Sequence, residues 1–433
     1  MAEIVAAEVV VVGGGPAGIA AATLAAESDA DVVVLDENPG PGGQIWRHRR
    51  REEIPGSARG WVERFFKSGA RLIGGAQVVL ASPDRRLVAE LCSPPGETLE
   101  VQAEILILAT GARERFLPFP GWTLPNVVGV GAAQALVKSG VSFRGKRVVL
   151  AGSGPLLLPA AATLSRGGAR VAVVAEQAPP AAVARFALGL SLRPDKLLQA
   201  ALFRAQFLGA RYRTGVWIAS ARGDDRVREA VLTDGRRCWT EPCDFLCCGY
   251  GLVANLELPL LLGCAVDHGR VAVDELLRTS LPGISCAGEL TGVGGVELAL
   301  VEGEIAGLAA AGRLDQARRL LRRRSNLLAF AQSLERAFAL RHELKSLPLA
   351  ETLVCRCEDV PFGRLDPAWS RRQAKLYTRA GMGPCQGKVC GPALEFLFGW
   401  EADSVRLPLR PTSLSNFLLG ARDQRPEAEE RAM

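Results

Sequence analysis

The sequence has few of the features that mark membrane-spanning, exported or nucleic-acid-binding proteins. No apolar run reaches the roughly 18 residues that span a bilayer. The net charge is only +6 over 433 residues, and the basic residues are dispersed, which argues against nucleic acid as the main partner. Met1–Ala7 has no basic segment ahead of an apolar one, so we expect no signal peptide.

Histidine is also scarce, and the cysteines do not form the expected redox pair. The chain has three histidines, and neither Cys-x-x-Cys nor Cys-x4-Cys lies near the two glycine turns described below. The chemistry of a disulfide reductase is therefore absent. Eleven cysteines without an export signal indicate core thiols and metal ligands rather than a disulfide framework. We expect a reducing cytoplasm, with docking on the inner face of a membrane as an alternative.

Apolar runs and glycine turns predict two nucleotide-binding units. Glu8–Val12 and Asp31–Leu35 read as buried parallel strands that flank an Ala-rich helix, and a second unit of this kind begins at Arg147. The predicted fold class is α/β, a flavoprotein with two dinucleotide-binding domains. We expect Phe245–Cys248 to return to the first domain. The predicted divisions are 1–125 and 245–320 for an FAD-binding domain, 126–244 for an inserted NAD(P)-like domain, and 321–433 for a helical linker, a cysteine module and a disordered tail beyond Ala421.

The first glycine turn fits G-x-G-x-x-G between a strand and a helix. Its first glycine allows the tight turn, the second admits a pyrophosphate and the third permits close helix packing. An acid should end the next strand and bind a ribose hydroxyl, and Asp36 with Glu37 stands there. The candidate residues of this unit are Gly13, Gly15, Pro16, Ala17, Gly18, Asp36 and Glu37.

Three later segments favour FAD over NAD at this first site. Each resembles a segment with which two-domain flavoproteins line the FAD, and their order along the chain agrees as well. Where those proteins usually have Asp in the last segment, this chain has Glu289. The added candidates are Gly43 and Gln44, Thr110 and Gly111, and Gly288, Glu289 and Gly295.

The second glycine turn departs from the pattern. Gly152 and Gly154 begin it in the usual way, but Leu157 takes the place of the third glycine and should prevent the closest approach of helix and strand. Glu176 ends the following strand and could still bind a ribose. The sequence leaves three interpretations open: an NAD(P) site, a site for another adenine nucleotide, or a fold that no longer binds a ligand.

Four late cysteines form two close pairs. Cys355 and Cys357 are separated by one residue, and Cys385 and Cys390 by four, in a segment that also contains glycines and basic residues. Four thiolates are the ligands of a [2Fe–2S] cluster, and backbone N–H groups and basic side chains offset its negative charge. Structural zinc is the alternative, although zinc modules favour C-x2–4-C spacing in both pairs.

With these residues in view, the chain resembles the α subunits of bacterial heteromeric amino-acid dehydrogenases over about residues 8 to 410. This group includes opine oxidases, D-hydroxyproline dehydrogenase, archaeal proline dehydrogenase and hydrogen cyanide synthase. The segments that carry the resemblance are Gly42–Ile45, Ala109–Arg115, Leu117–Trp122 and Thr378–Gly383. The cysteine module resembles the bacterioferritin-associated ferredoxin type, except that its last pair is Cys-x4-Cys instead of Cys-x2-Cys.

The resemblance implies a division of labour. A separate flavoprotein β subunit oxidises the amine, and electrons pass through the cluster to FAD in the α subunit, often with an FMN at the subunit boundary. A small ferredoxin-like γ subunit completes some complexes. D-hydroxyproline dehydrogenase is the favoured member, and an opine dehydrogenase is the alternative. An NAD(P)H-dependent ferredoxin-type reductase and a non-catalytic assembly subunit remain as two further classes.

Overall fold

The computed structural model describes residues 3–48, 54–92, 95–402 and 404–421. The chain divides into two compact units. Unit 1 comprises Met1–Ala112, Ala254–Ala329 and Asp403–Met433, and unit 2 comprises Arg113–Val253 and Phe330–Ala402. The predicted tail beyond Ala421 lies outside the described residues. The three-part division expected from the sequence remains a prediction.

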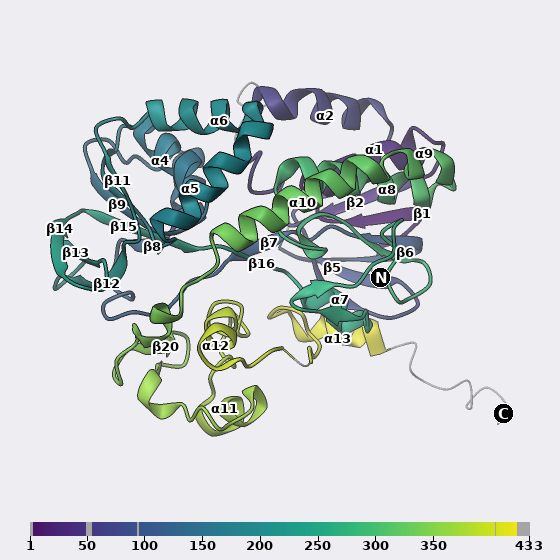
Figure 1. Cartoon of the computed structure of the whole chain (residues 1–433). Coiled ribbons are helices and arrows are strands. Elements are labelled where there is room, and N and C mark those ends of the chain that lie inside the picture. The colour runs from purple at the N-terminus through teal and green to yellow at the C-terminus, as the bar shows by residue number, and fades with distance from the viewer. Residues whose placement is uncertain (1–2, 49–53, 93–94, 403, 422–433) are drawn as a thin grey trace, which may run out of the picture. The chain divides into compact units, whose positions relative to one another are not determined.

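Unit 1 is built on a seven-stranded sheet in the order β3-β2-β1-β6-β5-β4, with β19 also paired to β6 (Figure 1). Strands β1, β2, β3 and β19 run parallel to their neighbours, whereas β4 and β5 form an antiparallel meander on β6. Val9–Val12 of β1 and Val32–Val34 of β2 are buried on both faces, as expected of a covered parallel sheet. The strands are β1 (Glu3–Val12), β2 (Val32–Asp36), β3 (Arg71–Gly74), β4 (Ala76–Ala81), β5 (Arg86–Cys92), β6 (Pro95–Leu108) and β19 (Ile284–Cys286).

Two helices of unit 1 pack with their backbones unusually close. Helix α1 (Pro16–Ala26) begins with proline at its first turn, where no N–H donor is needed, and continues with alanines. A Cβ atom at Gly303 or Gly307 of α8 (Val296–Ala310) would lie 2.1–2.2 Å from carbonyl oxygens of α1. Small residues on both helices therefore let the two backbones approach closely. The other helices are α2 (Gly56–Lys67), α7 (Glu257–Leu262), α9 (Leu314–Arg319) and α13 (Leu414–Ala421), and α10 (Leu321–Ala337) spans the boundary at 329 and 330.

Unit 2 contains a parallel sheet in the order β11-β10-β9-β15-β8. Strand β15 (Phe245–Tyr250) pairs with β9 and β8, so the expectation that it belongs to the first sheet is wrong. Its apolar side chains fill the two cores of this unit instead. The remaining elements are β8 (Val127–Gly129), α3 (Val130–Lys138), β9 (Arg147–Ser153), α4 (Leu157–Arg166), β10 (Arg170–Glu176), α5 (Pro180–Gly189), α6 (Pro194–Ala205) and β11 (Arg211–Thr214).

Unit 2 also carries an antiparallel sheet and the cysteine module. The sheet has the order β12-β13-β14, from β12 (Trp217–Arg222), β13 (Glu229–Thr233) and β14 (Cys238–Pro242). The module has its own small core around Val354, Val360 and Trp400. Its helix α11 begins with a capping box, in which Ser370 and Gln373 exchange hydrogen bonds with each other's backbone N–H groups. The module elements are β20 (Leu353–Cys355), β21 (Val360–Pro361), α11 (Arg371–Thr378) and α12 (Cys390–Phe398).

No helix in the described part of the chain combines the length and the apolar character that crossing a membrane requires.

Candidate functional site

The first glycine turn connects β1 to α1 at the carboxyl end of the sheet. A Cβ atom at Gly13 would lie 2.3 Å from the carbonyl oxygen of Ala109, and one at Gly18 would lie 1.8 Å from that of Gly13. A Cβ atom at Gly15 would meet no atom within 4 Å. The first and third glycines are therefore required by backbone packing, whereas the second faces open space at the helix N-terminus.

Asp36, at the end of β2, anchors this turn. Its carboxylate accepts hydrogen bonds from the backbone N–H of Gly14, from the N–H of Asn38 at 2.6 Å and from the side-chain amide of Asn38 at 2.8 Å. Burial raises the pKa of Asp36, and these hydrogen bonds oppose the rise. Glu37 instead forms an ion pair with Arg410 at 2.6 Å and is partly exposed.

The other predicted segments gather around the same turn. The N–H of Gly42 donates to the carbonyl of Gly14 at 2.7 Å, and a Cβ atom at Gly43 would lie 3.0 Å from the Cα of Gly15. Gln44 follows directly in this loop. A Cβ atom at Gly288 would lie 2.8 Å from the Cβ of Ala17. Thus four segments distant in sequence, including the one that follows β6 at Ala109, meet around this turn at the carboxyl ends of the strands.

Thr110 and Gly111 follow β6 and are held by Asn255. The side-chain amide of Asn255 donates to the carbonyl of Thr110 at 2.8 Å, and its backbone N–H donates to that of Gly111 at 3.0 Å. Gly111 has a φ of +69°, a conformation that favours glycine. The segment is therefore fixed in place by the chain itself.

Glu289 is partly buried, and one of its carboxylate oxygens is buried without a hydrogen-bond partner in the described ranges. Oε1 accepts from the backbone N–H of Gly295 at 3.0 Å, whereas Oε2 has no hydrogen-bond partner among the described residues. Burial raises the pKa of Glu289 to about 7. A buried polar atom without a partner is costly, so this oxygen marks a place where a hydroxyl-bearing ligand would fit.

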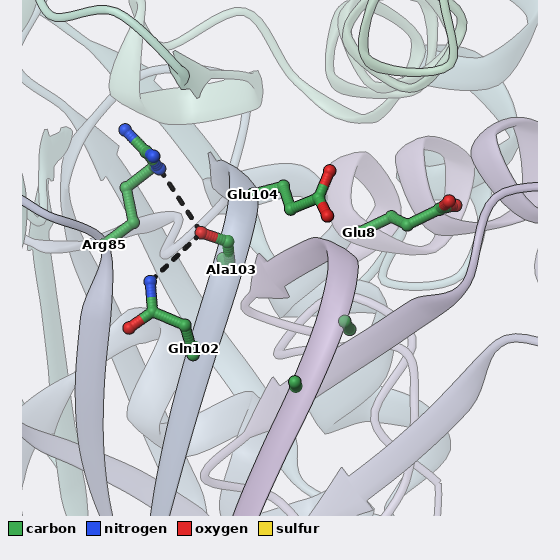
Figure 2. A pocket seen from close by; sticks show the side chains of 7 residues that line it. Glu8, Arg85, Gln102, Ala103 and Glu104 are labelled. Atoms are coloured by element: carbon green, nitrogen blue, oxygen red, sulfur yellow. Dashed lines mark hydrogen bonds between the residues drawn. The ribbon is translucent and has the colours of Figure 1, made fainter.

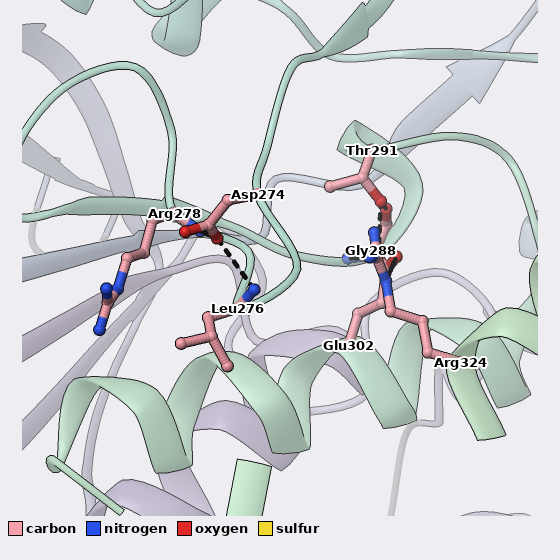
Figure 3. A network of polar contacts seen from close by, with 7 residues as sticks. All are labelled: Asp274, Leu276, Arg278, Gly288, Thr291, Glu302 and Arg324. Atoms are coloured by element: carbon pink, nitrogen blue, oxygen red, sulfur yellow. Dashed lines mark hydrogen bonds and ion pairs between the residues drawn. The ribbon is translucent and has the colours of Figure 1, made fainter. Parts of the chain in front are cut away.

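A buried ion pair of Glu302 and Arg324 holds the 288–291 segment in place (Figure 3). Glu302 accepts from the backbone N–H of Gly288 at 2.9 Å and from the hydroxyl of Thr291 at 2.6 Å, while Arg324 donates to its other oxygen at 2.9 Å. Burial raises the pKa of Glu302 despite this pairing with Arg324. The network joins α8, α10 and the 288–291 loop, and so it sets the position of Gly288 and Glu289.

Sequence reasoning missed several residues of this site. Asn38 binds both Asp36 and Arg47, whose Nη2 donates to the Asn38 side-chain oxygen at 2.8 Å. The Nε of Arg47 is buried without a partner in the described part of the chain. Glu302 and Arg324 were missed as well. Arg47 is three residues beyond Gln44, and that closeness to the glycine loop was the one available signal.

The second glycine turn, in unit 2, is covered by the chain's own backbone. The Ser153 hydroxyl donates to the carbonyl of Phe338 at 2.8 Å, and the Gln177 side chain binds Ser153, Ala339 and Arg341 at 2.8–3.1 Å. Glu176 is fully buried and accepts from the N–H groups of Gly154 and Ala178 at 2.7 and 2.8 Å. The polar groups that a nucleotide would use are thus bound within the protein.

The four late cysteines line a single pocket of about 140 Å³ in unit 2, together with Trp122, Arg356 and Val389. Within it the thiols form two hydrogen-bonded pairs, Cys390 with Cys355 and Cys357 with Cys385. No group of three or more histidine, cysteine, aspartate or glutamate side chains in the described ranges is arranged to hold a metal ion. The sulfur atoms are therefore gathered as pairs rather than around one point.

Backbone N–H groups point at the sulfur atoms. Cys355 accepts from the N–H groups of Cys357, Glu358 and Gly381, the last at 3.5 Å, and Cys357 accepts from that of Cys385. The hydrogen bond from Cys390 and these N–H groups lower the pKa of Cys355 to about 6. A Cβ atom at Gly383 would lie 2.3 Å from that of Cys357, so glycine is needed there. The loops thus favour a thiolate at Cys355.

One stretch of the chain matches a known family. It contains the first glycine turn in unit 1 and the parallel sheet of unit 2. The model of the pyridine nucleotide-disulphide oxidoreductase family matches residues 7–306. The chain belongs to this family. It is accordingly a member of a family of FAD-dependent oxidoreductases, and its FAD-binding α/β fold is the one predicted.

Relatives within the family cover nearly the whole chain. An opine oxidase subunit of Rhizobium meliloti (strain 1021) is 34% identical over 94% of this chain and 97% of its own length. Hydrogen cyanide synthase subunit HcnB of Pseudomonas aeruginosa is 31% identical over 88% of this chain and 90% of its own. L-proline dehydrogenase from P. horikoshii has a similar fold, with a TM-score of 0.67 at 17% identity over 96% of this chain and 80% of the other. The resemblance to amino-acid dehydrogenase subunits is confirmed.

The adjacent cysteines Cys247 and Cys248 lie in the cores of unit 2. All eleven cysteines are free thiols, and burial raises the pKa of Cys247 and Cys248, the adjacent pair in unit 2. Buried thiols with raised pKa values are poor nucleophiles. Cys247 and Cys248 are therefore better suited to packing in the core than to nucleophilic chemistry.

A shallow hollow of about 470 Å³ lies elsewhere in unit 1 (Figure 2). It is lined by residues 6–8 of β1 and 102–104 of β6, several residues before each strand ends. It is therefore not at the carboxyl ends of the strands, where ligands bind in such folds. Arg85 and Gln102 both donate to the carbonyl of Ala103 at 3.3 Å. Arg85 and Gln102 are thus bound within the protein, and the hollow contributes nothing to the site.

Proposed function

We propose that this chain is the electron-transferring subunit of a heteromeric dehydrogenase that oxidises a secondary amine next to a carboxylate. It would hold FAD in unit 1 and a [2Fe–2S] cluster in the cysteine module, and a separate flavoprotein subunit would bind and oxidise the substrate. The observation that carries the proposal is the gathering of four cysteine sulfur atoms around one pocket in a chain of an FAD-dependent family.

The crevice of unit 1 supports the FAD assignment. Gly15 leaves room for a pyrophosphate at the N-terminus of α1, Asp36 lies where a ribose would bind, and the unsatisfied Oε2 of Glu289 could accept a hydroxyl of the ribityl chain. The unsatisfied Nε of Arg47 could donate to a phosphate or ribose oxygen. The FAD supplies two-electron chemistry when bound, and these residues hold and orient it.

The pairing of the sulfur atoms supports a cluster over zinc. A structural zinc ion needs its ligands converging on one centre, whereas a [2Fe–2S] cluster spreads four thiolates over two irons. The pairs Cys355 with Cys390 and Cys357 with Cys385 correspond to two sulfur atoms per iron. The N–H groups directed at Cys355 and Cys357 would stabilise the negative charge of the bound cluster.

The closed second turn argues against an NAD(P)H-dependent reductase. Residues 338–341 occupy the mouth of the turn, and binding a dinucleotide there would require breaking the hydrogen bonds of Ser153 and Gln177. We therefore infer that electrons reach this chain from another protein rather than from NAD(P)H. The opine oxidase and hydrogen cyanide synthase relatives are both named as subunits, which supports a partner protein here.

Opines are the substrate class that the relatives favour. D-hydroxyproline, preferred on the sequence motifs, shares the same reacting group, because both compounds are secondary amines on the carbon that bears a carboxylate. Oxidation to the imine would release two electrons and two protons per amine, and the partner subunit would select among the compounds. We place the complex in the reducing cytoplasm, where exposed thiols stay unoxidised; association with the inner membrane is part of the proposal to be tested.

The test is to purify the chain alone and together with a candidate flavoprotein β subunit, and to follow dye reduction with opines, D-hydroxyproline, proline and glycine. We expect bound FAD, iron and acid-labile sulfide in the isolated chain, but turnover only in the complex. Substrate turnover by the isolated chain would contradict the division of labour. Zinc without sulfide would contradict the cluster.

A further inference from the structure

Residues 404–417 follow the cysteine module in the chain and belong to unit 1, and we call them the strap. Leu409 of the strap lies in the main core of unit 1, and its backbone N–H donates to the carbonyl of Val79 in β4 at 2.9 Å. Phe417 packs against a small core formed by Val79, Leu80 and Val88. The strap is therefore a packed part of unit 1.

A polar cluster fixes the far end of the strap. Glu90 in β5 accepts hydrogen bonds from the hydroxyl of Thr412 at 2.5 Å and from the side-chain amide of Asn416 at 3.3 Å. The same amide donates to the Thr412 hydroxyl at 2.6 Å, and Asn416 is buried. Because a buried polar group is costly to leave unpaired, these contacts hold the strap in one place.

Arg410 lies between these two attachments and forms an ion pair with Glu37. Its Nη2 is 2.6 Å from Oε2 of Glu37, and both side chains are partly exposed. Exposed ion pairs contribute little when two mobile side chains must be ordered, but here the backbone of Arg410 is already fixed by its neighbours in the strap. The pair therefore ties the strap to the residue that follows Asp36.

The loop after β2 carries the groups assigned to the adenosine half of FAD. Asn38 donates to the Asp36 carboxylate at 2.6 and 2.8 Å and accepts from Arg47 at 2.8 Å. The turn between β3 and β4 braces this loop through the N–H of Gly75, which donates to the Asn38 carbonyl at 3.1 Å. The ion pair at Glu37 is a second brace. A shift of the loop would move both Asp36 and Arg47.

The charge of Glu37 also affects this site. Burial raises the pKa of Asp36, and the neighbouring charge of Glu37 adds to the rise. An unpaired carboxylate beside the crevice would repel the anionic pyrophosphate of FAD, whereas a guanidinium 2.6 Å from it offsets that charge. Arg410 can thus act on flavin binding without touching the flavin.

We propose that Arg410 is a positioning residue for the adenosine half of FAD, acting through Glu37 on the loop that carries Asp36 and Asn38. This inference rests on the proposed flavin site of unit 1. It adds to that site a residue that lies more than 100 positions beyond Glu289 and belongs to none of the glycine motifs. The strap is accordingly part of the flavin site.

The test measures flavin binding by variants of the full chain. Arg410→Gln removes the charge, Arg410→Lys keeps it, and Glu37→Gln removes its partner; the double variant of Arg410→Gln and Glu37→Gln completes the cycle. Arg71→Gln is the matched control, because Arg71 pairs with Asp31 at 3.3 Å just before the other end of β2, also on the surface of unit 1. Flavin fluorescence released on dilution gives the dissociation constant of FAD, and urea unfolding of each variant is followed in parallel.

We expect Arg410→Gln to raise the dissociation constant of FAD about two- to fivefold, the range that loss of a partly exposed ion pair gives. Arg410→Lys should restore most of the affinity, and the difference between Arg410→Gln and wild type should shrink at high salt. In the Glu37→Gln background, Arg410→Gln should have no further effect. Arg71→Gln should bind FAD as the wild type does.

Two results would overturn the inference. One is an unchanged dissociation constant in Arg410→Gln. The other is an equally large effect of Arg410→Gln with and without the Glu37 carboxylate, since Arg410 would then not act through Glu37. A weaker affinity shared by Arg71→Gln, with a lower urea midpoint in both variants, would likewise reduce Arg410 to a stabilising residue and contradict the proposal. A wild-type chain that binds no FAD would instead overturn the proposed flavin site, so the two failures are distinguishable.

Discussion

Gly15 is the residue at which the flavin assignment can be tested most directly. A Cβ atom there meets no protein atom within 4 Å, so a larger side chain fits the protein but occupies the space proposed for the pyrophosphate. We expect Gly15→Val to lower flavin content by about tenfold or more, since one 1.4 kcal/mol loss already costs tenfold in affinity. Flavin absorbance per chain in the purified variant measures this.

The control for this variant is Gly60→Val. Gly60 lies in α2, and a Cβ atom there also meets nothing within 4 Å. Its fold should tolerate the change, and flavin content should equal that of the wild type. Full flavin occupancy in Gly15→Val would show that the turn serves only the fold.

At the level of single residues, sequence motifs could name glycines but not their supports. Backbone atoms leave no room for a Cβ atom at Gly13 and Gly18, and the Cys357 side chain leaves none at Gly383, so glycine is required at all three positions. The side chains that position the loops, Asn255 and the Glu302–Arg324 pair, come from distant parts of the chain and belong to no short pattern. Their partners can be identified only from the fold.

Helices α1 and α8 depend on each other through their small residues. A Cβ atom at Gly307 would lie 2.2 Å from the carbonyl oxygen of Ala21, an overlap that requires the helices to separate. We expect Gly307→Val to destabilise unit 1 by about 1–3 kcal/mol, as overpacked cores do, and to weaken flavin binding because both helix N-termini move. Thermal unfolding with and without added FAD measures both effects. Gly60→Val again serves as the control, because a Cβ atom at Gly60 meets no atom within 4 Å.

Strand β10 ends at Glu176, whose burial couples the stability of unit 2 to pH. Burial raises its pKa from 4.5 to about 7, so the folded protein binds a proton more tightly than the unfolded chain does. The stability that this proton contributes is present below pH 4.5 and is lost as the pH rises from 4.5 to 7. Over this window the loss is about 3 kcal/mol for a single group.

Glu176→Gln should remove this pH dependence. The free energy of unfolding of the variant should therefore rise relative to that of the wild type as the pH rises from about 5 to about 8. The lost carboxylate oxygen adds a difference that does not depend on pH. Urea unfolding at several pH values measures the difference, and Glu351→Gln, at an exposed position in unit 2, is the control. A constant difference between Glu176→Gln and wild type across this range would contradict the proposed titration.

The order of the elements was predictable from the sequence, but the sheet to which each belongs was not. The strand–turn–helix–strand units around residues 13 and 152 follow from buried apolar runs and glycine turns, and both are present as β1-α1-β2 and β9-α4-β10. Strand β15 carries an equally apolar run that suits any buried parallel strand. Only packing decides between two sheets of the same kind, and here β15 lies between β9 and β8.

On the scale of the whole molecule, the two proposed cofactors occupy separate units. The flavin residues lie in Met1–Ala112 and Ala254–Ala329, and the four cysteines lie in Phe330–Ala402. Each unit has its own buried cores. Loss of one cofactor should therefore leave the other bound. In the proposed function, the chain would pass electrons between these two cofactors, and the partner subunit would bind the substrate.

Cys385→Ser tests this independence. Cys385 pairs with Cys357, and serine is a poor ligand for an iron–sulfur cluster. The visible and EPR signals of the cluster should therefore disappear. Flavin content should stay at the wild-type level because the unit 1 crevice is untouched. Cys238→Ser, at an exposed cysteine of β14 outside the pocket, should lose neither signal. Joint loss of flavin and cluster in Cys385→Ser, with Cys238→Ser unaffected, would mean that the two units bind their cofactors cooperatively and that the cysteine module is required to keep the flavin crevice intact.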